Sequence, residues 1–306
     1  SVDGIFTLSP FIGGFPLPAE DSTLESKQYN AYLYNDITFY NKINLLLGVS
    51  YDDIERVATN TTTDEVNPKL GLTWDVNPAL RLRLAAFETV KRNLVANQTL
   101  EPTEIAGFIQ FYDDVNDSKS TVYGLGIDGR PSSQIYTGIS LQQRDLDIPE
   151  TTGSTITFNS QEESRYQFYL NWLLNRQLAL SLLYTFEEIK NDFVDPINLE
   201  TSTVPLTLKY SHSSGFFASA KFTHVDQEGQ YEIPVPSKYA DNFNLTDVLL
   251  GYRLPRRHGF LSLQVNNIFD EKFSYQDDSV FSNDFFNQSP QYIPERNIYA
   301  RITLNF

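Results

Sequence analysis

The stretch Ile298-Tyr-Ala-Arg-Ile-Thr-Leu-Asn-Phe306 alternates strictly between apolar and polar side chains up to the last residue. Because successive side chains of a strand point to opposite faces, its apolar residues share one face. A soluble domain rarely ends on an exposed apolar strand, since an unpaired edge invites aggregation. In a transmembrane β-barrel such a strand has neighbours on both sides, and its apolar face meets lipid. A terminal strand of a soluble sheet is the alternative, but the same alternation recurs along the chain and favours the barrel.

The composition excludes a helical membrane protein and allows a barrel. The mean hydropathy is −0.33, and the sequence contains no run of about 18 apolar residues, the length that a membrane-spanning helix requires. The chain has no cysteine, which excludes a disulfide framework and a thiolate metal site. Its net charge of −16 argues against nucleic acid as a partner.

Two segments show the strand pattern most clearly. In Leu178-Ala-Leu-Ser-Leu-Leu-Tyr-Thr-Phe186 and in Tyr166-Gln-Phe-Tyr-Leu-Asn-Trp-Leu-Leu174, every second residue is apolar. Nine tilted strand residues span about 23 Å, close to the apolar band of an outer-membrane barrel. The residues between them, Asn175-Arg-Gln177, predict a tight turn.

The same hairpin pattern repeats and predicts an all-β fold, a transmembrane antiparallel up-and-down β-barrel of about 14 strands, or part of a larger barrel. An even number of strands places both termini in the periplasm. The strands are expected near residues 4–12, 28–40, 43–57, 66–76, 80–91, 120–130, 135–145, 166–174, 178–186, 204–212, 216–225, 245–254, 260–270 and 298–306.

Long connections alternate with the short turns, as extracellular loops alternate with periplasmic turns in such barrels. They are expected at residues 58–65, 92–118, 146–163, 190–203, 226–243 and 271–292. Short turns and long connections alternate strictly only if residues 92–118 form a single extracellular connection. The apolar piece Ile105-Ala-Gly-Phe-Ile-Gln-Phe111 is therefore placed in a loop or folded into the barrel mouth.

One architecture covers residues 1–306, with no linker or helical periodicity. The sequence opens at Ser1-Val-Asp-Gly without a methionine, a basic region or an apolar core. Either a signal peptide has been removed or the chain is the C-terminal part of a longer protein.

Charged strand residues are expected to point into the lumen, because an Arg or Lys on the lipid face would cost about 2–4 kcal/mol at the midplane. They form either a charged pore and substrate path or a mutually compensating ion-pair lattice, and their interspersed signs favour the lattice. The predicted lumen charges are Asp36, Asp52, Asp75, Arg81, Arg83, Arg144, Glu187, Lys209, Lys221, Asp247, Arg253 and Arg301.

The sequence predicts no catalytic centre, cofactor or metal site. Acidic pairs such as Asp113-Asp114 lie in the long connections but complete no calcium loop, and solvated loop charge is the simpler interpretation. The only histidines are His212, His224 and His258, and no Gly-x-Ser-x-Gly elbow occurs. We therefore expect that the protein is not an enzyme.

Several segments resemble the barrels of TonB-dependent outer-membrane receptors. Residues 261–273, Pro294-Glu-Arg296 and 301–306 are similar to their last hairpin, and 32–38, 47–52 and 67–75 are similar to successive strands. Leu100-Glu-Pro-Thr-Glu104 resembles their mid-barrel Leu-x-Pro-Glu stretch. The alternating strand that ends at Phe306 also resembles the signal read by the barrel assembly machinery, which assigns Ile298, Ala300, Ile302, Leu304 and Phe306 to assembly.

The resemblance spans roughly residues 28–306 and implies an outer-membrane location and passage of a solute or polymer. Barrels of this family have roughly 22 strands and a plug, which implies that this chain is the C-terminal portion of a longer barrel. Similar barrels also occur behind helical repeats in export porins. The expected partners are outer-membrane lipid, lipopolysaccharide, the assembly machinery, and an upstream plug or helical-repeat region. In the alternative function, the barrel anchors a periplasmic domain or partner complex and conducts nothing.

Overall fold

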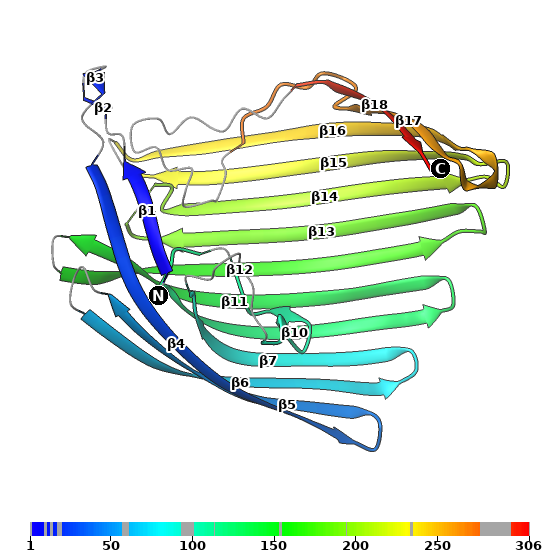
Figure 1. The fold of residues 1–306 in the computed structure, drawn as a ribbon. Coiled ribbons are helices and arrows are strands. Elements are labelled where there is room, and N and C mark those ends of the chain that lie inside the picture. Colours follow the sequence, from blue (N-terminus) through cyan, green and yellow to red (C-terminus); the bar gives the residue numbers. More distant parts are fainter. Residues whose placement is uncertain are drawn as a thin grey trace. The chain divides into compact units, whose positions relative to one another are not determined.

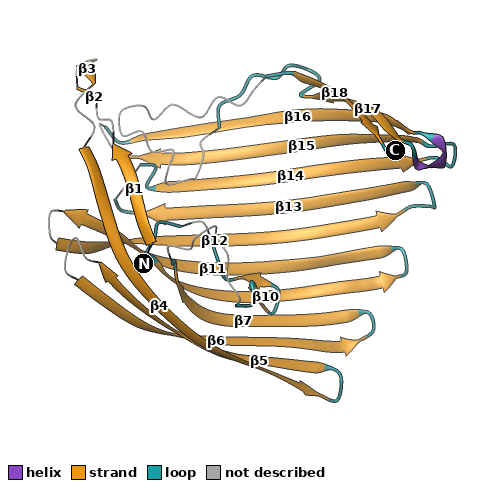
Figure 2. Cartoon of the chain, viewed as in Figure 1, coloured by secondary structure: helices purple, strands orange, loops and turns teal. Residues whose placement is uncertain are grey.

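The computed structural model describes residues 2–8, 11–12, 15–16, 20–56, 61–92, 101–112, 114–152, 155–193, 195–232, 235–275 and 295–305. About four fifths of them lie in strands, and the described residues contain one short 3₁₀ helix at Pro255–Arg257 (Figure 2). Among these residues, no helix is long and apolar enough to span a membrane. The strands are β1 (Val2–Leu8), β2 (Phe11–Ile12), β3 (Phe15–Pro16), β4 (Glu20–Phe39), β5 (Ile43–Arg56), β6 (Thr61–Asn77), β7 (Leu80–Val90), β8 (Glu104–Ile105), β9 (Phe108–Ile109), β10 (Lys119–Ser132), β11 (Ile135–Thr152), β12 (Thr155–Leu173), β13 (Leu178–Asn191), β14 (Asn198–Ser211), β15 (Phe216–Tyr231), β16 (Ser237–Arg253), β17 (Gly259–Asn266) and β18 (Asn297–Leu304).

Fourteen strands form one sheet in the order β1-β4-β5-β6-β7-β10-β11-β12-β13-β14-β15-β16-β17-β18. Each strand pairs with the next along the chain, apart from the two small hairpins β2–β3 and β8–β9, which stay outside this sheet. The prediction of an antiparallel up-and-down sheet of about 14 strands is therefore confirmed. Within the described ranges, β1 and β18 are the two edges of the sheet.

The chain divides into two compact units. Unit 1 comprises residues 1–72, 85–123 and 145–160, and unit 2 comprises residues 73–84, 124–144 and 161–306. In unit 2, strands β12 to β17 run side by side, and the short turns that join them lie at common ends of the strands (Figure 1).

Each strand of unit 2 has an apolar face and a polar face. Leu182 of β13 lies across from Leu170 of β12 and from Leu206 of β14, whereas the next residue, Ser181, lies across from Asn171 and Thr207. Large apolar side chains such as Trp172 and Leu208 remain exposed on the first face. On β5 of unit 1, Leu47 and Val49 are likewise exposed, whereas Ser50 and Asp52 on the other face are buried. In both units we call the face with the exposed apolar side chains the apolar face and the opposite one the polar face.

Several predicted connections are shorter than expected. Residues 146–163 were assigned to a long connection, but β11 continues to Thr152 and β12 begins at Thr155. Likewise β15 extends to Tyr231 and β16 begins at Ser237, within the predicted connection 226–243. The extension of β15 over residues 226–231 is almost entirely polar, so the sequence there lacks the alternation that lipid contact imposes. In β11 and β12, residues 145–148 and 155–158 do alternate, but these runs are only four residues long.

Glycines on the polar face make room for aromatic rings from other strands. Gly251 lies directly across from Phe217, and the Phe217 ring occupies the space where a Gly251 side chain would begin. Gly48 and Tyr34 form the same pair between β4 and β5, where a Cβ on Gly48 would lie 2.7 Å from the tyrosine ring. The ring of Tyr169 covers Gly138 in the same way. A ring can thus lie flat on the sheet wherever its neighbour lacks a side chain.

Gly138→Ala should destabilise the sheet. The added Cβ would lie 2.6 Å from the Tyr169 ring and 2.7 Å from the carbonyl oxygen of Ile127, and the backbone carbonyl cannot rotate away. We expect a loss of about 1–3 kcal/mol, as for other overpacked positions, measured from the midpoint of urea-induced unfolding in lipid vesicles.

Gly129→Ala is the matched control, because the nearest atom to its Cβ would lie 3.4 Å away, an ordinary contact. Equal stabilities of the two variants would contradict the packing seen at Gly138.

Candidate functional site

A short hairpin lies outside the main sheet of unit 1. Strands β8 and β9 pair antiparallel, Glu104 with Ile109 and Ile105 with Phe108. The turn between them, Ala106-Gly107, has positive φ at both residues, 49° and 81°, as a two-residue hairpin turn of the favoured hand requires. The prediction that residues 105–111 stay outside the barrel strands is confirmed.

The hairpin is packed by its apolar side chains. Ile105 and Phe108 are buried and form a cluster with Ala85 and Phe87 of β7 and with Val122 of β10. On β6, Gly71 leaves room for the hairpin, since a Cβ there would lie 2.9 Å from the Ile105 side chain. The hairpin is therefore fitted to this part of the sheet.

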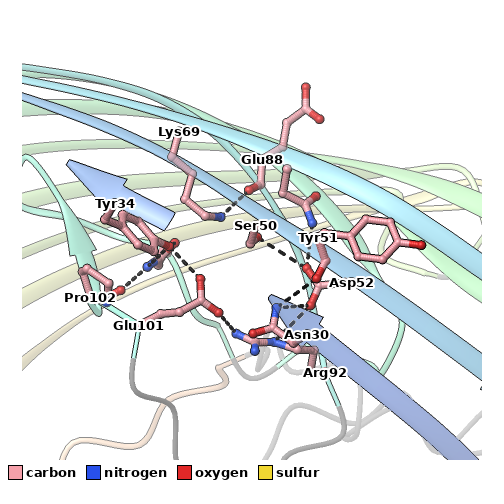
Figure 3. A network of polar contacts seen from close by, with 12 residues as sticks. Asn30, Tyr34, Ser50, Tyr51, Asp52, Lys69, Glu88, Arg92, Glu101 and Pro102 are labelled. Atoms are coloured by element: carbon pink, nitrogen blue, oxygen red, sulfur yellow. Dashed lines mark hydrogen bonds and ion pairs between the residues drawn. The ribbon is translucent and has the colours of Figure 1, made fainter. Parts of the chain in front are cut away.

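Glu101, just before the hairpin, joins it to two other segments (Figure 3). One carboxylate oxygen pairs with the guanidinium of Arg92, and the other accepts a hydrogen bond of 2.6 Å from the Tyr34 hydroxyl. Glu101 is only 4% exposed. On the far side of the hairpin, Gln110 donates to the carbonyl oxygen of Pro102 and closes the segment on itself.

Asp52 of β5 is the second buried carboxylate of this network. It accepts hydrogen bonds of 2.7 Å from Asn30 and 2.8 Å from Asn67, and a longer one from Ser50. The Nε atom of Arg92 lies 3.6 Å from Asp52, so one arginine lies between Asp52 and Glu101 and neutralises both in part (Figure 3).

A buried lysine completes the charge balance. The ammonium of Lys69 donates a 2.7 Å hydrogen bond to the carbonyl oxygen of Glu88, and its residue is 3% exposed. Two carboxylates, Asp52 and Glu101, thus face two cations, Lys69 and Arg92. Buried charges persist when they are paired and hydrogen-bonded. The arrangement can hold a chain segment fixed on the polar face. We call Asp52, Glu101, Lys69, Arg92 and Tyr34 together the hairpin lock.

Only Asp52 of the hairpin lock was among the predicted lumen charges. Arg92, Glu101, Lys69 and Tyr34 were missed, although the stretch Leu100-Glu-Pro-Thr-Glu104 had been noted. Acidic and basic residues inside a long polar connection look like solvated charge. Only the apolar residues 105–111 within it signalled that this connection packs against the sheet.

Half of the predicted lumen charges of unit 2 are ion-paired on the polar face, namely Asp75, Arg81, Arg83, Arg144 and Glu187. Arg81 makes a bidentate pair with Asp75, at 2.6 and 3.1 Å, and is the one predicted arginine whose partner was also predicted. Arg83 pairs with Asp128 at 2.7 and 3.3 Å, and Tyr169 donates 2.8 Å to the same carboxylate. Two further pairs are Arg144–Glu163 at 3.0 Å and Arg165–Glu187 at 3.1 Å.

The remaining predicted charges are not brought together in this way. In unit 1, Asp36 accepts a 3.0 Å hydrogen bond from Asn44. In unit 2, Arg253 bonds to Ser211 at 3.1 Å and lies over the Phe217 ring, and Arg301 lies across from Ser262. Lys209, Lys221 and Asp247 line a common hollow.

Four residues that the sequence predicts to serve in assembly, Ile298, Ala300, Ile302 and Leu304, share the apolar face of β18, and Ile298 and Ile302 are about two-thirds exposed. Phe306 lies outside the described residues. Within the described ranges, no group of three or more His, Cys, Asp or Glu side chains is placed to hold a metal ion.

Comparison with known proteins assigns the family. The model of the TonB dependent receptor-like β-barrel matches residues 3–268. The chain therefore belongs to this family, and its fold is an outer-membrane β-barrel of the TonB-dependent receptor type. No curated protein matches the chain.

Solved structures agree on the fold. The pyoverdine outer-membrane receptor FpvA from Pseudomonas aeruginosa is 16% identical, with a TM-score of 0.66 over 96% of this chain and 44% of the receptor. The FpvAI–pyocin S2 complex matches at 17% identity and a TM-score of 0.63, covering 94% of this chain and 40% of that one. The FrpB iron transporter from Neisseria meningitidis is 11% identical, with a TM-score of 0.66 over 82% of this chain and 42% of FrpB. This chain thus spans less than half the length of these structures.

Proposed function

We propose that this chain forms part of the wall of an outer-membrane passage for a solute, with the polar face turned toward the lumen. The observation that carries the proposal is the hairpin lock, which holds residues 101–112 against the polar face by a buried, charge-balanced network. A barrel wall that served only as an anchor for another domain would not need a chain segment fixed on its polar face. The similar structures are receptors and an iron transporter, which supports transport rather than catalysis.

The proposal includes the wider context of the chain. Residues 1–306 form one barrel segment that belongs to the C-terminal part of a longer barrel, and an upstream plug or helical-repeat region shares its lumen. Coverage of less than half of the similar structures and the two sheet edges β1 and β18 support this. The short turns lie on the periplasmic side with both termini, and the apolar face meets lipid, with lipopolysaccharide in the outer leaflet.

The second candidate function is an anchor that conducts nothing. It is favoured by the ion pairing of Arg81, Arg83, Arg144 and Arg165 on the polar face, since a compensated lattice keeps a wet interior without serving a substrate. The two functions differ in whether the polar-face charges act on passing ions.

The test is conductance of the intact protein in planar bilayers. In a passage, Arg81→Ser with Arg83→Ser leaves Asp75 and Asp128 uncompensated beside the path and should shift ion selectivity toward cations several-fold, because wall charges act strongly in a confined lumen. The matched variant Asp75→Asn with Asp128→Asn should shift selectivity toward anions.

If these charges served stability alone, both double variants would be destabilised and would not differ from each other in ion selectivity. Equal selectivity of the wild type and both variants, or a barrel that never conducts, would contradict the passage and favour the anchor.

A further inference from the structure

Lys209 of β14 and Lys221 of β15 are two neighbouring cations on the polar face of unit 2. Lys209 lies directly across from Ser219, and Lys221 lies directly across from Thr207. The two lysines are therefore diagonal neighbours, roughly 7–8 Å apart on the sheet, close enough for both ammonium groups to reach one small ligand. Within the described residues, neither lysine makes an ion pair or a side-chain hydrogen bond.

This absence of an ion pair sets the lysines apart from four arginines of the same face, although Arg253 and Arg301 also lack a carboxylate partner among the described residues. Arg81, Arg83, Arg144 and Arg165 each pair with a carboxylate. The chain has 39 acidic and only 23 basic residues, so the two lysines are not unpaired for lack of acids.

One acid, Asp247, lines the same hollow as the two lysines but forms no ion pair with either of them within the described residues. Asp247 lies across from Lys221, but its carboxylate accepts the backbone N–H of Asn267 at 2.9 Å. That hydrogen bond ties Asp247 to the chain that follows β17. Two ammonium groups beside one carboxylate leave a net positive charge in the hollow, with neither lysine ion-paired among the described residues.

The lysines line a hollow with further hydrogen-bond donors. It has a volume of about 450 Å³, and its lining includes Lys209, Lys221, Thr207, Ser219 and Gln264. A second hollow of about 360 Å³ shares Lys209 and Ser219 with it and extends to Arg253. Hydroxyl and amide donors beside paired ammonium groups suit an anion with several oxygen atoms.

We propose that this hollow binds an oxyanion, the phosphate or carboxylate group of a solute. Lys209 and Lys221 supply charge-assisted hydrogen bonds, and Thr207 and Ser219 supply neutral ones from the same strands. The biological role of this site rests on the proposed passage function, because an anion site in the wall selects negatively charged solutes for passage. Binding itself needs no conduction, so its failure is distinguishable from failure of the passage.

The experiment measures acylation of each lysine by an amine-reactive ester in the intact, detergent-solubilised protein, with peptide mass spectrometry as the readout. Inorganic phosphate and, separately, citrate are compared with chloride at equal ionic strength. Phosphate or citrate should slow acylation of Lys209 and Lys221 at least several-fold and in a saturable manner. Lys42, in the turn after β4, is the internal reference and should react equally in all three salts.

Two variants decide whether the lysines act as one site. Lys209→Gln should abolish most of the protection at Lys221, whereas Arg165→Gln, which removes a paired cation of the same face, should leave it intact. The proposal would be overturned if Lys221 stayed protected in Lys209→Gln or if Lys42 were protected equally. It would also be overturned if neither anion slowed acylation of the two lysines. Lysines that are unreactive before any anion is added would overturn it as well, since the hollow would then be covered.

Discussion

Replacing Glu101 with alanine should release the 101–112 hairpin from the sheet. Among the described residues, the change leaves the largely buried Arg92 with the 3.6 Å ion pair to Asp52 and its contact with the Phe111 ring. It also removes the short hydrogen bond of the Tyr34 hydroxyl and leaves the 3.5 Å contact with Gln110. Removing one partner of a buried ion pair typically costs about 3–5 kcal/mol. The packing of Ile105 and Phe108 against β7 and β10 is then the main contact that holds the hairpin, so it should open more often. The strands are paired with one another in the sheet and should stay folded.

The absence of cysteine from the chain makes a single thiol at Ala106→Cys a specific reporter of that opening. Its labelling by a thiol reagent should be roughly tenfold or more faster with Glu101→Ala, because local opening sets the rate. Glu101→Gln, which keeps an acceptor for Tyr34 but loses the charge opposite Arg92, should lie in between.

Glu104→Ala is the matched control, since Glu104 is an exposed acid on the same hairpin. If Glu104→Ala and Glu101→Ala label at the same rate, the hairpin lock does not hold the segment.

Replacing Leu182 with arginine should block assembly of the barrel, whereas Ser181→Arg should be tolerated. Leu182 lies on the apolar face between Leu170 and Leu206, where an arginine would meet lipid at a cost of about 2–4 kcal/mol. Ser181, one residue earlier, points to the polar face and bonds to Asn171 at 2.9 Å. Folded barrel is measured by its heat-modifiable mobility in membranes, and stability by urea unfolding in lipid vesicles.

Similar losses in both variants would mean that the two faces of β13 meet the same environment, and the assignment of the apolar face to lipid would be wrong. The comparison is internal, because both substitutions add the same side chain to neighbouring residues of one strand.

The strand count and the facing of the residues could be predicted because both depend on local sequence. Period-two alternation such as that of Leu180, Leu182 and Tyr184 fixes the strand and its two faces. Turn residues between such runs fix the hairpins. Asn175, for example, accepts the backbone N–H groups of Gln177 and Leu178 at 2.8 and 3.0 Å.

The hairpin lock could not be predicted because its contacts join distant parts of the chain. Tyr34 and Glu101 are 67 residues apart, and no local pattern shows that Glu101 is buried. The partner of Arg83, Asp128, is 45 residues away and was likewise missed. Pairs of this kind follow from the order of strands in the sheet and from side-chain length, so they become visible only once the strands are aligned.

The glycine–aromatic pairs have a consequence for how neighbouring strands find their alignment during folding. A slip of one residue would turn every side chain to the wrong face, but a slip of two keeps all the faces and is not opposed by alternation. After such a slip, Tyr34 would lie opposite Leu46 or Ser50 rather than Gly48, and Phe217 opposite Leu249 or Arg253 rather than Gly251. In each case a side chain would occupy the space that the ring needs. In these two strand pairs, one glycine opposite an aromatic ring thus disfavours the misalignments that hydrophobicity alone would allow.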